Sequence, residues 1–404
     1  MATDINPEKI EHLLTRGVDT VYPKREMLEA RLKKGERLRI YVGFDPTAPF
    51  LHIGHALQLK KLKEFQDMGH EVIWLIGSFT GMIGDPTDKS ATRSQLTKKQ
   101  VLENAATYKK QASKILKFTG RNAVKIKFND KWLSKMSFAD VVELASHFTV
   151  QQMSERDMFA NRLKDGKPIY MHEFMYPLMQ GYDSVAMDVD VEIGGSDQTF
   201  NMLAGRTLMK SMAGKEKIVL TLKLLTNDEG KKMSKSEGGF IALSDVPEDM
   251  YGKLMAMNDS MILPYFELVT DMSMEEIDGK RIAMEQGVNP RDVKAELAHM
   301  VVAQLYDASA ADAAAAHFAN IFQKGKMPDE MEEFVLSSEK NIVDVLVESG
   351  LTKSKSEARR MIEQKAVKID GVVVTGIDMN IVGAKDGVVL QRGKRHFVRL
   401  VNKR

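Results

Sequence analysis

The sequence has no cysteine among its 404 residues, which excludes disulfide bonds and thiolate metal sites. It also lacks an N-terminal apolar run of signal-peptide or membrane-spanning length. Internal repeats and low-complexity tracts are absent as well. These absences predict a soluble cytoplasmic protein and give no indication of a metal site formed by the protein or of a membrane partner.

The composition is that of an ordinary globular protein, with 43% hydrophobic and 28% charged residues, and the length predicts two to four domains. The charge is unevenly distributed. Residues 340–404 carry 14 Lys and Arg against 7 Asp and Glu, whereas the rest of the chain carries 44 against 49. A basic C-terminal part after an acidic body predicts that this part contacts a polyanion.

Between Arg37 and Lys223, apolar runs of strand length alternate with helix-like stretches, which predicts a Rossmann-like doubly wound parallel sheet. The clearest strand is residues 71–77, where five consecutive apolar residues indicate burial on both faces. Ligands of such sheets bind beyond the carboxyl ends of the strands, where His52 and Asp85 fall.

Downstream, residues 247–322 have helical spacing only, and residues 324–333 are polar with Gly and Pro. A short helix over residues 341–350, a basic helix over 354–364 and a hairpin across Asp370-Gly371 follow. We therefore predict an α/β domain with a connective insertion over 1–240, an α-helical domain over 241–325, a linker over 326–339 and a small α+β domain over 340–404.

Residues 50–55, Phe-Leu-His-Ile-Gly-His, follow the strand-like run Arg39–Phe44 and begin a helix-like run that ends near Gly69. Two imidazoles three positions apart at a helix start lie on one face, where exposed N–H groups and the positive helix end favour a polyphosphate. Gly54 has no side chain, so an adenine ring or ribose can approach the backbone. On spacing alone, a helix cap or a solvated histidine pair stays an open alternative.

Residues 231–236, Lys-Lys-Met-Ser-Lys-Ser, supply the cations that such a site lacks. Gly230 precedes them and Gly238-Gly239 follow, which would let this segment close over a nucleotide and open again. Taken alone, a charge run of this kind is equally consistent with a solvated loop.

Together these two segments resemble the two signature motifs of class I aminoacyl-tRNA synthetases. Four further stretches, residues 41–48, 81–86, 176–183 and 194–198, look like the tyrosyl-tRNA synthetases within that class. The resemblance runs from about Tyr22 to the C-terminus, and its last part is similar to the S-four RNA-binding domain.

The resemblance implies that ATP and L-tyrosine form tyrosyl-adenylate with release of pyrophosphate, and that tyrosine then passes to the 3′ end of tRNA(Tyr). The attacking carboxylate is already ionised, so adenylate formation needs positioning and charge stabilisation instead of a general base. ATP would be a substrate accompanied by Mg²⁺, and the family usually forms homodimers.

Site residues are carried over from the resemblance. The implied catalytic residues are Thr47, His52, His55, Lys232 and Lys235. The implied ATP contacts are Gly43, Asp45, His52, Gly54, His55, Gly195, Asp197, Lys232 and Lys235. The implied tyrosine contacts are Tyr41, Asp85, Tyr176, Gln180, Asp183 and Gln198.

The resemblance places Asp183 and Tyr41 against the substrate phenol oxygen. A buried carboxylate with an unfilled acceptor would reject phenylalanine, which offers no O–H. Tyr176 and Gln180 are four residues apart and Asp183 lies three further on, so one helix would span the subsite from ammonium to phenol.

The basic C-terminal part offers phosphate contacts for tRNA, and the implied residues are Lys353, Lys355, Arg359, Arg360 and Arg395. Glu357 and Glu363 are interleaved with them, so a solvated helix face is the alternative.

Three other functions stay open at this point. A ligase for another aromatic amino acid would not need Asp183 with Tyr41. A synthetase-derived RNA-binding or splicing factor would not need intact His52 and His55. A smaller nucleotidyltransferase would leave the helical and basic parts unexplained.

Overall fold

Two compact units, residues 1–311 and 312–404, make up the chain in the computed structural model. The structure describes residues 2–87, 96–155, 157–226, 240–322, 331–336, 338–384, 387–393 and 396–402. Every helix within these ranges is too short or too polar to span a bilayer.

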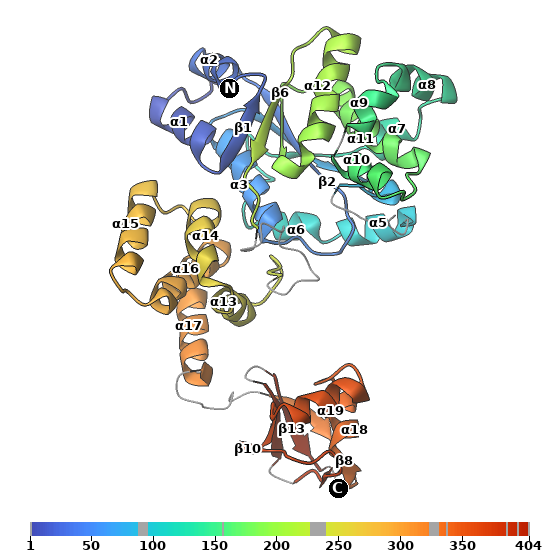
Figure 1. Ribbon diagram of the computed structural model, residues 1–404. Helices are drawn as coiled ribbons and strands as arrows, with labels where there is room; N and C mark the ends of the chain where they lie inside the picture. The colour runs from blue at the N-terminus through green and yellow to red at the C-terminus, as the bar shows by residue number, and fades with distance from the viewer. Residues whose placement is uncertain are drawn as a thin grey trace. The chain divides into compact units, whose positions relative to one another are not determined.

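A six-stranded sheet lies at the centre of the first unit, in the order β1-β6-β5-β2-β3-β4 (Figure 1). The bounds are β1 Val18–Tyr22, β2 Arg39–Phe44, β3 Glu71–Ile76, β4 Lys125–Phe128, β5 Val191–Gly195 and β6 Ile218–Leu222. Strands β2 to β6 pair in parallel, and β1 pairs antiparallel with β6. From β2 the chain proceeds through β3 to β4 in one direction and later through β5 to β6 in the other, which confirms the predicted doubly wound sheet.

Helices cover both faces of this sheet. On one face, Phe44 and Trp74 contact each other, and Phe44 also contacts His55 of α3. On the other face, Tyr41 packs in a buried cluster with Met187 of α11. The helices of this part are α1 Pro7–Thr15, α2 Arg25–Lys33, α3 Ile53–Asp67, α4 Thr80–Ile83, α5 Lys98–Ala105, α6 Tyr108–Ala112, α7 Asp130–Leu133, α8 Phe138–Ser146, α9 Val150–Ser154, α10 Asp157–Lys164, α11 Met171–Met187 and α12 Thr199–Ala213. Because side chains alternate along each strand, every strand contributes to both layers.

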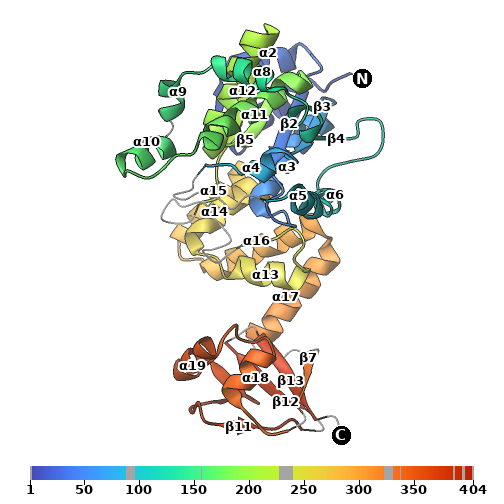
Figure 2. The same cartoon turned by 90° about the vertical axis from the view of Figure 1, so that its right-hand side faces the viewer.

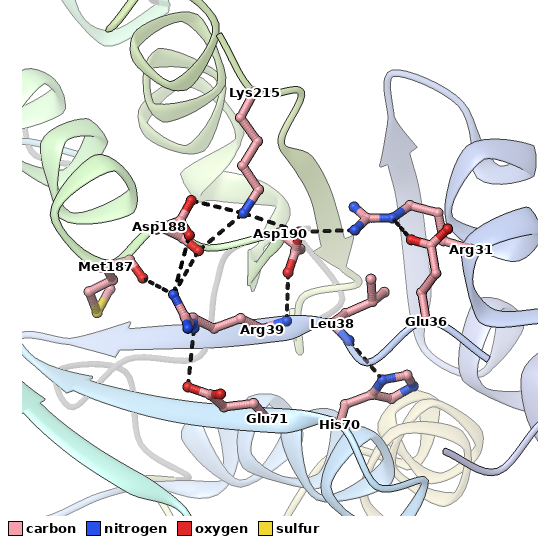
Figure 3. Close-up of polar contacts among 10 residues, drawn as sticks. All are labelled: Arg31, Glu36, Leu38, Arg39, His70, Glu71, Met187, Asp188, Asp190 and Lys215. Carbon is pink, nitrogen blue, oxygen red and sulfur yellow. Dashed lines mark hydrogen bonds and ion pairs between the residues drawn. The ribbon is translucent and has the colours of Figure 1, made fainter. Parts of the chain in front are cut away.

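The amino end of the sheet is closed by a polar network centred on Asp190 (Figure 3). The Asp190 carboxylate accepts hydrogen bonds from the Arg39 amide at 2.8 Å and from Arg31 at 3.0 Å, and pairs with Lys215 at 3.2 Å. Burial by itself raises the pKa of Asp190, but these donors hold that pKa below its ordinary value. The network therefore ties α2, β2 and the start of β5 together at the end of the sheet opposite the carboxyl ends of its strands.

The segment after β6 is helical, as its spacing predicts. Its helices are α13 Pro247–Met255, α14 Ile262–Val269, α15 Met274–Glu285, α16 Pro290–Leu305 and α17 Ala308–Phe322. Figure 2 shows α13 to α16 gathered together, and no strand interrupts the described residues from 247 to 322.

The second unit is a small α+β structure. Its elements are β7 Glu332–Val335, β8 Lys340–Asn341, α18 Ile342–Glu348, α19 Lys355–Glu363, β9 Val367–Ile369, β10 Val372–Val373, β11 Asn380–Ile381, β12 Val388–Arg392 and β13 His396–Val401. The predicted hairpin is confirmed, because β9 and β10 pair across Asp370 and Gly371, whose φ angles of 46° and 84° suit a primed turn. Ala358 and Ile362 face the core of this unit.

The predicted linker differs from the structure in one stretch. Residues 332–335, assigned to the linker over 326–339, form β7 and pair in parallel with β13. A two-glutamate segment has a weak strand signal by itself, and β7 forms because the edge of β13 offers backbone partners. Residues 323–330 and 337 lie outside the described residues.

Replacing the carboxylate at the centre of the amino-end network tests its role. We expect Asp190→Asn to lower the free energy of unfolding by about 1–3 kcal/mol at pH 7, because buried donors lose a charged acceptor. The folded pKa is lowered, so the contribution is present above the unfolded pKa of about 3.9 and is lost as pH falls through the folded value.

The measurement is urea unfolding at pH 7 and between pH 5 and 3, followed by tryptophan fluorescence. Both tryptophans, Trp74 and Trp132, lie in the sheet-containing part. Asp188→Asn is the matched control, because the Asp188 side chain is 66% exposed beside the same Lys215. An Asp190→Asn curve that matches this control at every pH would contradict the assigned role.

Candidate functional site

A pocket lies at the carboxyl ends of β2, β3 and β5, where the direction of the chain through the sheet reverses. It encloses about 910 Å³ of empty space. The predicted site residues that line it are Tyr41, Gly43, Asp45, Thr47, His55, Asp85, Tyr176, Gln180, Asp183, Asp197 and Gln198. The doubly wound topology thus gathers residues that are up to about 150 positions apart in the sequence.

A second pocket of about 700 Å³ adjoins the first and shares His55 and Gln58 with it. It is lined by the remaining described residues of the predicted nucleotide site, His52, Gly54 and Gly195. Leu222, Lys223 and Phe240 complete part of its wall. The structure thus places the predicted nucleotide residues around two adjoining hollows.

The two histidines cap α3. His52 is the N-cap residue, its Nδ1 accepts from the Gly54 amide at 3.1 Å, and His55 Nδ1 accepts from the His52 amide at 3.1 Å. The rings lie 3.8 Å apart. The helix-cap alternative is therefore correct as local structure, whatever else these side chains do.

This capping corrects the expectation of exposed N–H groups at the helix start. The amides of Gly54 and His52 donate to the imidazoles, the His55 amide donates to the His52 carbonyl, and the Ile53 amide donates to the Ile241 carbonyl. Since each Nδ1 accepts, the proton of a neutral ring sits on Nε2. What the helix start can offer an anion is therefore two imidazole N–H groups and the helix dipole.

The glycines also have a local explanation. A Cβ at Gly54 would lie 3.1 Å from the His52 ring, and one at Gly195 would lie 2.4 Å from the Asp197 carboxylate. At Gly194 a Cβ would lie 2.7 Å from the Met202 sulfur. Protein side chains already lie close to these spaces, so local packing by itself favours glycine at these positions.

Helix α11 carries three of the predicted residues on its pocket face, as their spacing predicts: Tyr176, Gln180 and Asp183. Asp183 is the deepest, with 2% of its surface exposed. Its two oxygens accept from Trp132 Nε1 at 2.7 Å and Asn129 Nδ2 at 3.2 Å. Burial raises the pKa of the Asp183 carboxyl well above its ordinary value, against the lowering effect of both donors.

These contacts refine the expectation of an unfilled acceptor. Each Asp183 oxygen already accepts one hydrogen bond, and each retains a lone pair for another donor. Tyr41 is equally buried, and its hydroxyl lies 3.0 Å from Ser184 Oγ. Burial and the neighbouring Glu192 and Asp183 raise the pKa of Tyr41 well above 10, which keeps its hydroxyl protonated.

Other polar side chains of the pocket are held in pairs. The Tyr176 hydroxyl donates to Asp45 at 2.8 Å, and Gln180 Nε2 donates to Glu192 at 3.0 Å. Gln198 Nε2 donates to Asp85 at 2.6 Å. Each amide or hydroxyl therefore has an orientation before any ligand enters.

The pocket is strongly acidic. None of its described lining residues is a lysine or arginine, while five are carboxylates: Asp45, Asp85, Asp183, Glu192 and Asp197. The negative field of these carboxylates attracts an ammonium group and disfavours phosphates, which suits an amino acid in the first pocket. His52 and His55, which line the second pocket, are the better donors to a phosphate.

Sequence reasoning missed several pocket residues. Glu192 and Lys217 form a buried ion pair behind the pocket. A signal for them existed, because a charged residue within or beside an apolar parallel strand must have a partner. Trp132, Asn129 and Ser184 had no comparable signal, since nothing in their spacing points to Asp183 or Tyr41.

Three predicted residues, Lys232, Lys235 and Arg395, lie outside the described residues. The other predicted tRNA contacts, Lys353, Lys355, Arg359 and Arg360, are exposed at or near α19. Lys355 pairs with Asp344 at 2.7 Å, so part of this basic surface is neutralised.

Comparison with known proteins identifies the family of this chain. Residues 33–323 match the family described as tRNA synthetases class I (W and Y), and residues 322–400 match the tyrosine–tRNA ligase SYY-like C-terminal domain. Tyrosine–tRNA ligase 2 of Vibrio cholerae is 47% identical, covering 96% of this chain and 98% of its own length. Tyrosine–tRNA ligase of Thermotoga maritima is also 47% identical, covering 98% of each chain.

Among solved structures, a C-terminally truncated mitochondrial tyrosyl-tRNA synthetase of Aspergillus nidulans superposes with a TM-score of 0.65 at 25% identity. The superposition covers 78% of this chain and 94% of that structure. With two family matches that together span residues 33–400 and relatives of this identity over nearly the whole length, the chain belongs to the tyrosyl-tRNA synthetases of class I.

Proposed function

We propose that this chain attaches L-tyrosine to tRNA(Tyr) in two steps, and that the acidic pocket on α11 is its tyrosine subsite. The observation that carries the assignment is the buried Asp183 beside Tyr41 at one end of a pocket whose remaining walls are rich in carboxylates. A phenol fits the first feature, and an α-ammonium group fits the second.

At the deep end, the phenol O–H donates to Asp183 as a third donor beside Trp132 and Asn129, which favours the ionised carboxylate. Phenylalanine leaves this buried acceptor without that donor, at a cost in binding. At the other end, Tyr176, Gln180 and Asp85 hold the substrate ammonium, with Gln198 close to the substrate carboxyl group.

ATP lies across the adjoining pocket and the rim of the first one. The Nε2–H groups of His52 and His55 donate to its phosphates, assisted by Thr47. Gly43, Asp45, Gly54, Gly195 and Asp197 surround the nucleoside. Lys232 and Lys235, outside the described residues, complete the phosphate contacts by family resemblance, and Mg²⁺ accompanies ATP as part of the substrate.

In the first step a tyrosine carboxylate oxygen attacks the α-phosphorus, the bond from that phosphorus to the bridging oxygen breaks, and pyrophosphate leaves. The nucleophile carries its own charge, so these residues position it and stabilise charge on the phosphates without removing a proton. In the second step a 3′-terminal ribose hydroxyl of tRNA attacks the carbonyl carbon, and AMP leaves.

The division of labour follows the predicted domains. Residues 1–240 perform the chemistry, 241–325 contact the anticodon side of tRNA, and 340–404 bind tRNA through Lys353, Lys355, Arg359, Arg360 and Arg395. Cytoplasmic location is part of the same proposal.

We also propose a homodimer. The insertion between β4 and α11, together with the first residue of α11, exposes large apolar side chains, among them Phe138 at 84%, Val150 at 72% and Met171 at 72%. Helices α8, α9 and α10 of this insertion lie at the periphery of the sheet (Figure 1). Exposed apolar side chains of this size are the material of a protein interface.

Asp183→Asn tests the phenol assignment. We expect kcat/KM for tyrosine in pyrophosphate exchange to fall about ten- to a hundredfold, because a hydrogen bond to a charged group contributes about 1.5–3 kcal/mol. KM for ATP should change little. Asp188→Asn, on the exposed end of the same helix, is the control, and equal kcat/KM in the two variants would contradict the assignment.

Replacing Arg359 and Arg360 together by alanine tests the tRNA surface. Both side chains are exposed on α19, so folding should persist. We expect KM for tRNA to rise and the slope of log affinity against log salt to decrease by about one for each cation lost. Pyrophosphate exchange should not change. Lys340→Ala, an exposed cation paired with Glu348, serves as control; unaltered charging of tRNA by the double variant would refute this surface.

The homodimer is tested by Phe138→Asp. A charge on an apolar interface is costly, so we expect the variant to sediment as a monomer at concentrations where the parent is dimeric. Val246→Asp, at a similarly exposed valine outside the insertion, should leave the dimer intact. A parent protein that sediments as a monomer would rule the dimer out.

A further inference from the structure

Lys217 is a fully buried lysine immediately before β6, with no exposed surface. Its ammonium group forms an ion pair with Glu192 and donates to Ser184 Oγ at 2.8 Å and to the Met202 carbonyl at 3.1 Å. Three acceptors from β5, α11 and α12 thus meet the three protons of one ammonium group.

Space for this ammonium depends on Gly205 of α12. A Cβ there would lie 2.4 Å from Lys217 Nζ and 2.9 Å from Ser184 Oγ. The missing side chain leaves room for the Lys217 to Ser184 contact, which places a charge next to the pocket without exposing it there.

The contact fixes the direction of a hydrogen-bond chain. An ammonium group has no lone pair, so Ser184 must accept from Lys217. The buried Ser184 hydroxyl then needs an acceptor for its own proton, and Tyr41 Oη lies 3.0 Å away. Tyr41 accepts from Ser184, so the Tyr41 proton is directed to its other side, where Glu192 of the pocket wall is one acceptor and a ligand in the pocket can be another.

Tyr41 lines the pocket, so a ligand in the pocket can accept a hydrogen bond from its hydroxyl. Asp183 receives N–H groups from Trp132 and Asn129 and presents acceptors to the pocket. A ligand hydroxyl between these groups would donate to Asp183 and accept from Tyr41. The chain of donors would run from Lys217 through Ser184 and Tyr41 to the ligand and end on Asp183.

We propose that Lys217, acting through Ser184, is a positioning residue that directs the Tyr41 hydroxyl proton into the tyrosine subsite, so that the subsite recognises the substrate phenol both as donor and as acceptor. This inference rests on the proposed function of the pocket. It makes Ser184 and Lys217 specificity determinants although neither lines the pocket.

The test is a double-mutant cycle of Ser184→Ala and Tyr41→Phe, measured by pyrophosphate exchange with tyrosine and with phenylalanine. Ser184→Ala keeps the Lys217–Glu192 pair, whereas replacing Lys217 would leave a buried carboxylate unpaired and disturb folding. We expect Ser184→Ala to lower kcat/KM for tyrosine about fivefold, the share of one neutral hydrogen bond, with KM for ATP and activity on phenylalanine unchanged.

Because Ser184 acts through Tyr41, the double variant should lose no more than Tyr41→Phe alone. Thr270→Val removes another buried hydroxyl, which lies at the end of α14 and lines neither pocket, and should leave the preference for tyrosine unchanged. Should the alanine variant fail to fold, Ser184→Cys gives the same test, since it keeps nearly the same volume with a weak donor.

Two failures are distinguishable. A parent protein without tyrosine-dependent exchange would overturn the proposed function itself. A parent with normal exchange, combined with additive losses in the cycle or an unchanged tyrosine to phenylalanine ratio in Ser184→Ala, would overturn only the positioning role.

Discussion

The cost of burying a carboxylate governs the candidate site. Asp183 is withdrawn from water at the base of the pocket, and the protein offsets that cost with an indole N–H and an amide N–H. Glu192 is buried as well and is matched by Lys217 and Gln180. These donors come from α7 and the residue before it, from α11, and from the residue before β6. The pocket therefore presents hydrogen-bond acceptors to a ligand from carboxylates that are almost completely shielded from water.

Carboxylate side chains have different surroundings at the two ends of the sheet. At the amino ends, Asp190 is surrounded by an amide, a guanidinium and an ammonium group, so its charge is compensated within the protein and serves stability (Figure 3). At the carboxyl ends, five carboxylates face a pocket with no described lysine or arginine in its wall. An excess of carboxylates over described cations in a pocket wall favours a cationic group on a ligand, which is why we place the candidate site at this end.

The start of α3 shows how one motif can have two roles. Its histidines complete the hydrogen bonds of the helix and close the backbone amides to ligands, and the same capping fixes the tautomer of both neutral rings, with the proton on Nε2. The Ile53 amide donates to the Ile241 carbonyl, and the Leu243 amide donates to the Leu51 carbonyl, so residues 241–243 are bonded directly to the segment that carries the two histidines. Residues 51–53 and 241–243, far apart in the sequence, thus share backbone hydrogen bonds.

The sequence by itself determined the alternation of strands and helices between Arg37 and Lys223, the helix carrying Tyr176, Gln180 and Asp183, and the Asp-Gly hairpin, because apolar period and turn chemistry are local properties. Through family resemblance it also pointed to about half of the residues that line the first pocket. Only the tertiary structure decided that the helix-start amides are occupied, that residues 332–335 form a strand, that Asn129 lines the pocket, and that Trp132, Ser184 and Lys217 lie behind it. Hydrogen-bond partners and buried ion pairs depend on which parts of the chain come together in the folded protein, and a local sequence pattern does not specify those long-range contacts.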